Sequence, residues 1–157
     1  MLIFYRTIFA VIFSLILVSC ASTDKRATGE IDDSGNYKYD AWRLENSTQL
    51  GAINILLDEA DVLILNQSHN AATDKLERVL RIKPDYAPAW SRLSWLALQA
   101  GTPERSIQMA KRSNSFAYSN PQLQKLNWTF IRTASEALHD EAGYDYANQK
   151  IDSLKAF

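Results

Sequence analysis

The chain has little of several residue types on which whole classes of protein depend. A single cysteine in 157 residues excludes a disulfide within the chain, and two histidines leave few ligands for a metal centre. The formal net charge of -1 gives no support for a nucleic-acid binder that neutralises phosphates. A glycine-rich phosphate loop is missing, and no segment alternates polar and apolar residues over the length of a strand. These absences favour an all-α protein with no cofactor and no metal.

The one cysteine, Cys20, ends an apolar N-terminal segment. Arg6 precedes a stretch, residues 8–18, in which Ser14 is the only polar residue, and this is the layout of a secretory signal. The run Leu-Val-Ser-Cys at 17–20 resembles the bacterial lipobox, in which the cysteine is acylated on sulfur and becomes the first residue of the mature chain. The resemblance implies that residues 1–19 are a lipoprotein signal peptide and that Cys20 carries a covalent lipid.

Two other interpretations of this segment stay open. Residues 2–20 are long enough to cross about 30 Å of hydrocarbon as an uncleaved helix, and a lone cysteine is often a small buried apolar residue. Lipid anchoring is favoured, and each buried methylene of an acyl chain contributes about 0.8 kcal/mol to it. Ala21 stands where aspartate would be the usual inner-membrane retention signal, so known sorting rules imply the periplasmic face of the outer membrane.

The segment after Cys20 is polar and has few large side chains. Ser, Thr, Asp, Lys, Gly and Asn dominate between Ala21 and Tyr37, and Ile31 is the only large aliphatic residue there. We therefore expect residues 20–37 to be the lipidated cysteine and a flexible tether. A chain of this length has a root-mean-square span of about 20–25 Å. Residues 38–157 then form one domain held near the membrane.

Helical spacing of apolar residues runs through most of this domain. The first stripe includes Leu50, Ile53, Leu56, Leu57 and Ala60, which follow the i, i+3, i+4, i+7 rule for a helix with one buried face. Proline and glycine then mark the boundaries, as at Pro84, Gly101 and Gly143. Further helices are predicted at 71–82, 88–99, 103–114, 121–140 and 144–155, with a loop at 67–70 and helix caps at Thr102 and Asn120.

The domain also repeats itself with a period of 34 residues. Moving forward by 34 superimposes Leu56 on Trp90 and Ala60 on Ser94. This is the period of the tetratricopeptide repeat (TPR), in which pairs of antiparallel helices stack and small residues let them approach. The predicted fold is all-α, with about two TPR-type hairpins plus capping helices. Generic packing of helical hairpins is the alternative.

Several short strings carry a narrower resemblance. Leu-Glu-Arg-Val-Leu-Arg-Ile-Lys-Pro at 76–84, Ala-Lys-Arg-Ser-Asn at 110–114 and Asn-Trp at 127–128 are similar to the small TPR lipoproteins of gammaproteobacteria. Some members of that group activate class A penicillin-binding proteins, the bifunctional peptidoglycan synthases. The resemblance implies an envelope protein as partner. The usual Gly-Asp between the first two helices is missing here, where Gln-Ser-His-Asn stands at 67–70.

By the same resemblance, the first helix of each pair lines a concave groove that binds a partner segment. Trp95 is the expected anchor, because a half-exposed tryptophan often dominates an interface. Core packing of Trp95 against the helix at 121–140 is the alternative, and Trp90 is expected to be structural. The groove positions are Asn54, Leu57, Asp61, Ile64 and Leu65 in the first repeat and Ser91, Trp95, Leu98 and Gln99 in the second.

Candidates for catalysis are weak. Neighbours such as His139, Asp140 and Glu141 point in different directions on a helix and cannot converge on one metal ion, and the acidic group 58–61 is expected to serve solubility. Basic residues on or just after the second helices could face an acidic partner or be simply solvated: Lys75, Arg78, Arg81, Lys83, Lys111 and Arg112.

The predicted function is therefore that of a non-enzymatic, lipid-anchored periplasmic adaptor that binds another envelope protein. Regulation of a peptidoglycan synthase is the leading hypothesis. A structural lipoprotein of a secretion or pilus platform is the alternative, and a wall-glycan hydrolase is the least favoured.

The lipid anchor is directly testable. Cells given radiolabelled palmitate should incorporate label into the wild-type protein and not into a Cys20→Ser variant, because only the thiol at this position can carry the anchor. The variant should also leave the membrane fraction. Equal labelling of both proteins, or none in either, would exclude the anchor.

Overall fold

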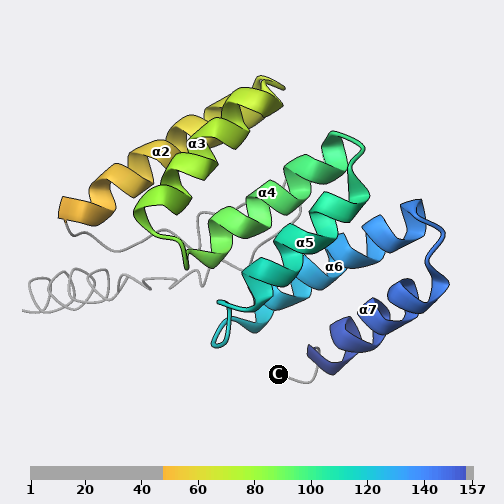
Figure 1. Cartoon of the computed structure of the whole chain (residues 1–157). Helices are drawn as coiled ribbons and strands as arrows, with labels where there is room; N and C mark the ends of the chain where they lie inside the picture. The colour runs from red at the N-terminus through yellow and green to blue at the C-terminus, as the bar shows by residue number, and fades with distance from the viewer. Residues whose placement is uncertain (1–47, 155–157) are drawn as a thin grey trace, which may run out of the picture.

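The computed structural model describes residues 48–154. The predicted signal peptide, the lipidation site Cys20 and the tether lie outside these residues, as do 38–47 and 155–157 of the predicted domain. The described chain is entirely helical, and its consecutive helices lie side by side as antiparallel pairs (Figure 1). The helices are α2 (Thr48–Leu65), α3 (His69–Ile82), α4 (Ala87–Gln99), α5 (Pro103–Asn114), α6 (Pro121–Ala137) and α7 (Glu141–Ser153).

This arrangement confirms the all-α fold of TPR-type helical hairpins. The pairs α2–α3 and α4–α5 are the two predicted repeats, and α6–α7 is a third hairpin in the place of the predicted capping helices. None of the helices within residues 48–154 is both long and apolar enough to span a membrane.

The hairpins stack so that equivalent helices form two layers. An ion pair between Asp61 and Arg92 joins α2 to α4, and α4 also contacts α6, so these first helices form one layer. An ion pair between Glu77 and Arg105 joins α3 to α5 in the other layer, with 3.6 Å between the charged atoms. The two faces of the stack therefore come from different helices and carry different side chains.

Most helix boundaries follow the sequence signals. Asn120 caps α6, because its side-chain oxygen accepts a hydrogen bond from the backbone N–H of Leu123 at 3.0 Å, and Pro121 follows in the first turn. Thr102 does not cap α5 as predicted. Its hydroxyl donates instead to the carbonyl oxygen of Ala97 at 2.9 Å, which ties the turn to the preceding helix.

Three predicted boundaries are wrong. The loop predicted at 67–70 is shorter, because Gln67 adopts a positive φ of 58° and lets α3 begin at His69. Likewise His139, with φ 55°, ends the turn after α6, which stops at Ala137 instead of Asp140. Gly143 does not break a helix. It lies in the first turn of α7, where a Cβ atom would collide with the side chains of Asp140 and Ser135.

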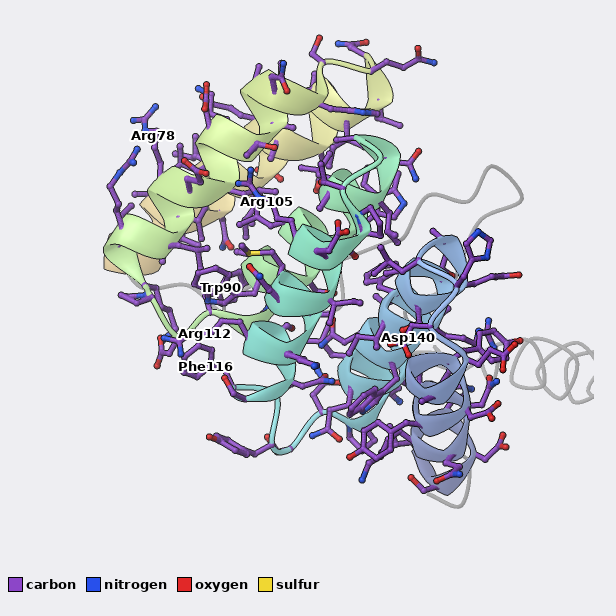
Figure 2. The ribbon with its side chains drawn as sticks, turned by 45° about the vertical axis from the view of Figure 1, so that its right-hand side comes forward. Arg78, Trp90, Arg105, Arg112, Phe116 and Asp140 are labelled. Carbon is purple, nitrogen blue, oxygen red and sulfur yellow. The ribbon has the colours of Figure 1, made fainter. Side chains whose placement is uncertain are left out.

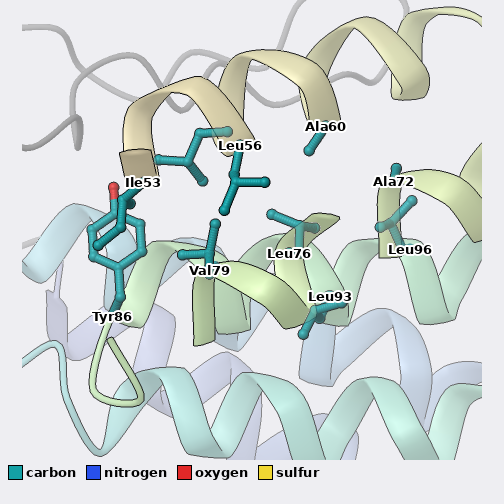
Figure 3. Packing of buried hydrophobic residues seen from close by; sticks show 11 residues of the cluster. Ile53, Leu56, Ala60, Ala72, Leu76, Val79, Tyr86, Leu93 and Leu96 are labelled. Carbon is teal, nitrogen blue, oxygen red and sulfur yellow. The ribbon is translucent and has the colours of Figure 1, made fainter. Parts of the chain in front are cut away.

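Two hydrophobic clusters fill the space between the helices. The first joins α2, α3 and α4 and is drawn in Figure 3, where side chains from three helices meet. The second joins α5, α6 and α7 to the start of α4. Burying each large aliphatic side chain contributes about 1.5–3 kcal/mol. Large buried members are Ile53, Leu56, Leu76, Val79 and Leu93 in the first cluster and Leu123, Leu126, Phe130 and Ile131 in the second.

Small residues lie where the helices approach most closely. Ser94 and Ser106 are fully buried, and the Ser94 hydroxyl donates to the carbonyl oxygen of Ser106 at 2.9 Å. Ser113 donates to the carbonyl oxygen of Ala87 at 2.8 Å and accepts a hydrogen bond from the amide of Asn127 at 2.8 Å. The serines that stand where TPR sequences commonly have glycine or alanine therefore bond to neighbouring helices.

Substitutions at Ser94 should separate hydrogen bonding from steric fit. Ser94→Ala removes the hydrogen bonds to Ser106 and should lower the free energy of unfolding by about 1 kcal/mol. Ser94→Leu forces extra volume between α4 and α5 and should lower it by about 2–3 kcal/mol or more. Chemical denaturation followed by circular dichroism measures both. A control, Gln108→Leu at an exposed position of α5, should change the value by less than about 0.5 kcal/mol, and equal effects at all three would refute the close approach.

Candidate functional site

The layer formed by the first helices contains a buried cation. Arg92 on α4 is only 1% exposed, and its Nη2 atom lies 3.2 Å from the Oδ2 atom of Asp61 on α2, which is one-third exposed. Because a buried guanidinium needs an anion nearby, this pair fixes the two helices relative to each other. Sequence analysis identified Asp61 and missed Arg92. The repeat gave no signal for it, because the equivalent position 34 residues earlier is the exposed Asp58.

Trp95 lies one turn after Arg92. Its side chain is half-buried and packs against both hydrophobic clusters, and its ring meets the ring of His69 edge to face at 5.8 Å between centroids. The two alternatives for Trp95, a half-exposed groove residue and a residue packed in the core, therefore describe parts of one arrangement. The ring is held by the core, including the cluster that contains α6, and part of it stays accessible.

The other predicted groove residues differ in how far their side chains are exposed. Asn54, Ile64 and Leu98 are half-buried, whereas Gln99 is exposed and Leu65 is 71% exposed. Together with Asp61, His69 and Trp95 they form a surface of mixed polar and apolar character, which we call the α2–α4 surface. Such a mixture suits a polypeptide segment, whose backbone needs hydrogen bonds and whose apolar side chains need contact area.

Two predicted members do not belong to this surface. Leu57 and Ser91 are both fully buried, which corrects the expectation that they line an open groove. Leu57 lies four residues after Ile53 and three before Ala60, so it shares the buried stripe of α2. Ser91 has a short side chain and lies one turn after the buried Ala87. Helical spacing already indicated burial for Leu57, whereas it gave no indication of the depth of Ser91.

The carboxylates of α2 are largely paired with basic residues of other helices. The helix has three acidic residues and no basic one. A hydrogen bond from the Lys75 ammonium holds the pKa of Glu59 below its ordinary value, and the two charged atoms lie 2.6 Å apart. Asp61 is likewise paired with Arg92, so cations of neighbouring helices balance two of the three carboxylates of α2.

A second hollow lies elsewhere in the domain. A depression of about 490 Å³ between α6 and α7 is lined by Ser135, His139, Glu141 and Tyr144, among others. Asp140 lies at its edge and accepts a hydrogen bond from the backbone N–H of Gly143 at 3.0 Å, which caps α7. Within residues 48–154, no three histidine, cysteine or acidic side chains gather as potential metal ligands.

The Asp61–Arg92 pair should matter for stability. Asp61→Asn removes the charge opposite a buried guanidinium and should lower the free energy of unfolding by about 1.5–3 kcal/mol. The difference in the free energy of unfolding between wild type and variant should persist at high salt, because burial protects the pair from screening by ions. Glu104→Gln, at an exposed position of α5, is the control and should have almost no effect in the same denaturation experiment. A loss as small as that of the control would show that the pair does not join α2 to α4.

No protein-family model matches the chain, and no solved structure matches it significantly. Among curated proteins, it is similar to a TPR repeat-containing protein of Rhizobium etli, with 36% identity over 66 residues. The match covers 41% of this chain and 32% of the relative, so the chain spans about a third of that protein's length. Proteins with such repeats are generally non-enzymatic scaffolds that bind other proteins. The similarity and the observed helical hairpins agree on a TPR-type repeat.

Proposed function

We propose that this protein is a lipid-anchored adaptor that binds a segment of another envelope protein on its α2–α4 surface. The observation that carries the proposal is the position of Trp95, half-buried between both hydrophobic clusters and one turn from the Asp61–Arg92 pair. A tryptophan held in this way offers a partner a large contact area. Because its side chain is already ordered by the core, little conformational entropy is lost on binding.

The proposed mechanism is binding without catalysis. Trp95 and the edge of His69 provide the apolar contact, while Asp61 and the exposed Gln99 can bond to polar groups of the partner segment. Because these side chains are positioned by packed helices, the surface is organised before the partner arrives, and little ordering opposes binding.

The anchor determines where this binding takes place. In the proposal, acylated Cys20 holds the domain at the periplasmic face of the outer membrane through the tether, residues 21–37. Confinement to one surface raises the effective concentration of any partner exposed there. The leading candidate partner is a class A penicillin-binding protein, and the sequence resemblance to TPR lipoproteins that activate such synthases supports this choice.

Capture of the partner in cells tests the α2–α4 surface. A photoreactive phenylalanine analogue at position 99 should crosslink to an envelope protein, which mass spectrometry then identifies. Trp95→Ala should reduce this crosslink at least about tenfold, as expected for a dominant interface residue.

Trp128→Ala is the matched control for that experiment. Trp128 is also half-buried and contacts an aromatic ring, that of Tyr146 at 5.5 Å, but it belongs to the α6–α7 hairpin. Its loss should change stability without changing capture. Equal capture by wild type and the Trp95 variant, or an equal loss in both tryptophan variants with helical circular dichroism intact, would refute the α2–α4 surface as the binding site.

A further inference from the structure

Charge is distributed unevenly along the described helices. The segment from α3 to α5 contains eight lysines and arginines against four acidic residues, whereas α2 has three acidic residues and no basic one. The segment from α6 to α7 has three basic and five acidic residues. The middle of the chain is therefore positive while both ends are negative, and an anionic surface would orient the molecule.

Some cations in the positive segment are neutralised by a neighbouring carboxylate. Lys83 lies 2.9 Å from Asp85 and lowers the pKa of that carboxyl by a hydrogen bond, so Asp85 stays ionised. Lys75 and Arg105 are paired in the same way with Glu59 and Glu77. By contrast, the exposed residues Arg78, Arg81 and Lys111 form no ion pair within residues 48–154. At longer range the charge of Arg78 also helps to lower the pKa of Glu59, whereas no carboxylate within residues 48–154 forms an ion pair with Arg81 or Lys111.

A fourth cation is held in place by aromatic rings. The guanidinium carbon of Arg112 lies 4.7 Å from the centroid of the Phe116 ring and 5.8 Å from that of Trp90. The indole N–H of Trp90 donates to the carbonyl oxygen of Pro84 at 2.8 Å, which fixes the ring between α3 and α5. Figure 2 shows Trp90, Arg112 and Phe116 together, with Arg78 on the same side. The position of the Arg112 guanidinium is thus fixed by the two rings.

Two exposed apolar side chains lie at the same end of the stack. Ile82 ends α3 and is 48% exposed, and Tyr118 in the connection between α5 and α6 is 82% exposed. The α3–α4 and α5–α6 connections lie at one end of the molecule in Figure 1. Basic residues bordered by an exposed tyrosine and an aliphatic residue are typical of surfaces that lie on a lipid interface.

We propose that Arg78, Arg81, Lys111 and Arg112, here called the basic face, bind the anionic phospholipid headgroups of the membrane to which the protein is anchored. Ile82 and Tyr118 contact the interface beside them. The basic face belongs to the second helices, so this contact turns the α2–α4 surface away from the bilayer and towards a partner. The inference rests on the lipid anchor of the proposed function. It explains how a tethered domain would present its α2–α4 surface to a partner.

A membrane fits this surface better than an acidic polypeptide does. The four cations are spread over two helices, and such a spread matches a plane of headgroups. The exposed side chains beside them, Ile82 and Tyr118, are uncharged and suit the lipid interface better than they suit an acidic polypeptide. Each basic residue near an anionic surface strengthens binding about fivefold, which is weak for a soluble domain. An anchored domain is already concentrated at the bilayer, so a few such contacts are enough to set its orientation.

Lipid crosslinking from Tyr118 tests the proposal on the acylated full chain in vesicles. A photoreactive phenylalanine analogue replaces Tyr118, and a second protein has it at position 99. Vesicles contain phosphatidylcholine alone or with phosphatidylglycerol. Position 118 should crosslink to lipid at least about tenfold more in the anionic vesicles, and salt near 0.5 M should remove the excess. Position 99 should crosslink to lipid weakly in both.

Two variants with the same change in net charge test whether the lipid crosslink depends on the basic face or only on the total charge. Arg78→Glu with Lys111→Glu changes the charge by -4 and should abolish the excess at position 118. Lys125→Glu with Gln122→Glu and Gln149→Glu also changes it by -4, at exposed positions of α6 and α7, and should preserve the excess. Denaturation of both variants checks that folding is intact, because cations in the last turn of a helix also interact with its dipole.

Several outcomes would overturn the proposal. These are equal lipid crosslinking at position 118 in both kinds of vesicle, equal loss in both charge variants, and crosslinking of position 118 in whole envelopes to an acidic protein in place of lipid. Flotation with phosphatidylcholine vesicles reports the anchor alone, and capture from position 99 reports the partner surface. Failure of the basic face is therefore distinguishable from failure of the proposed function.

Discussion

The close approach of helices at small buried residues is the constraint on which the rest of this structure depends. Ser94, Ser106 and Ser113 let α4, α5 and α6 pack at short distance, and their hydroxyls bond to carbonyl oxygens or side chains of the neighbouring helix. Large side chains can then fill the space between one hairpin and the next, as Leu93 and Phe130 do. A stack built in this way has no single centre, because each hairpin is stabilised by its neighbours.

The stack also separates two faces of different chemistry. The α2–α4 surface combines Asp61 with Trp95, and the Asp61–Arg92 pair holds its two helices in register. The opposite layer holds the basic face, where Arg112 is oriented by aromatic rings. An adaptor anchored to a membrane has to bind the bilayer on one side and its partner on the other. The proposed roles assign these two tasks to the two layers of helices.

Much of the fold followed from sequence, because period and punctuation are local properties. The 34-residue spacing and the cap at Asn120 predicted the hairpins, and the structure confirms them. Errors arose where the backbone adopted a positive φ at a residue other than glycine, as at Gln67 and His139. Such a conformation depends on the packing of the flanking helices, so the residue type gives little warning of it.

The candidate surface was predictable only in outline. Sequence by itself determined which residues lie on the first helices, since helical spacing fixes the direction of each side chain, and it placed Asp61 and Trp95 there. Only the tertiary structure decided depth and pairing elsewhere: Ser91 became buried, and Arg92 entered the interior opposite Asp61. Exposure and ion pairing are set by contacts between helices that are distant in sequence, and these contacts exist only after the hairpins have stacked.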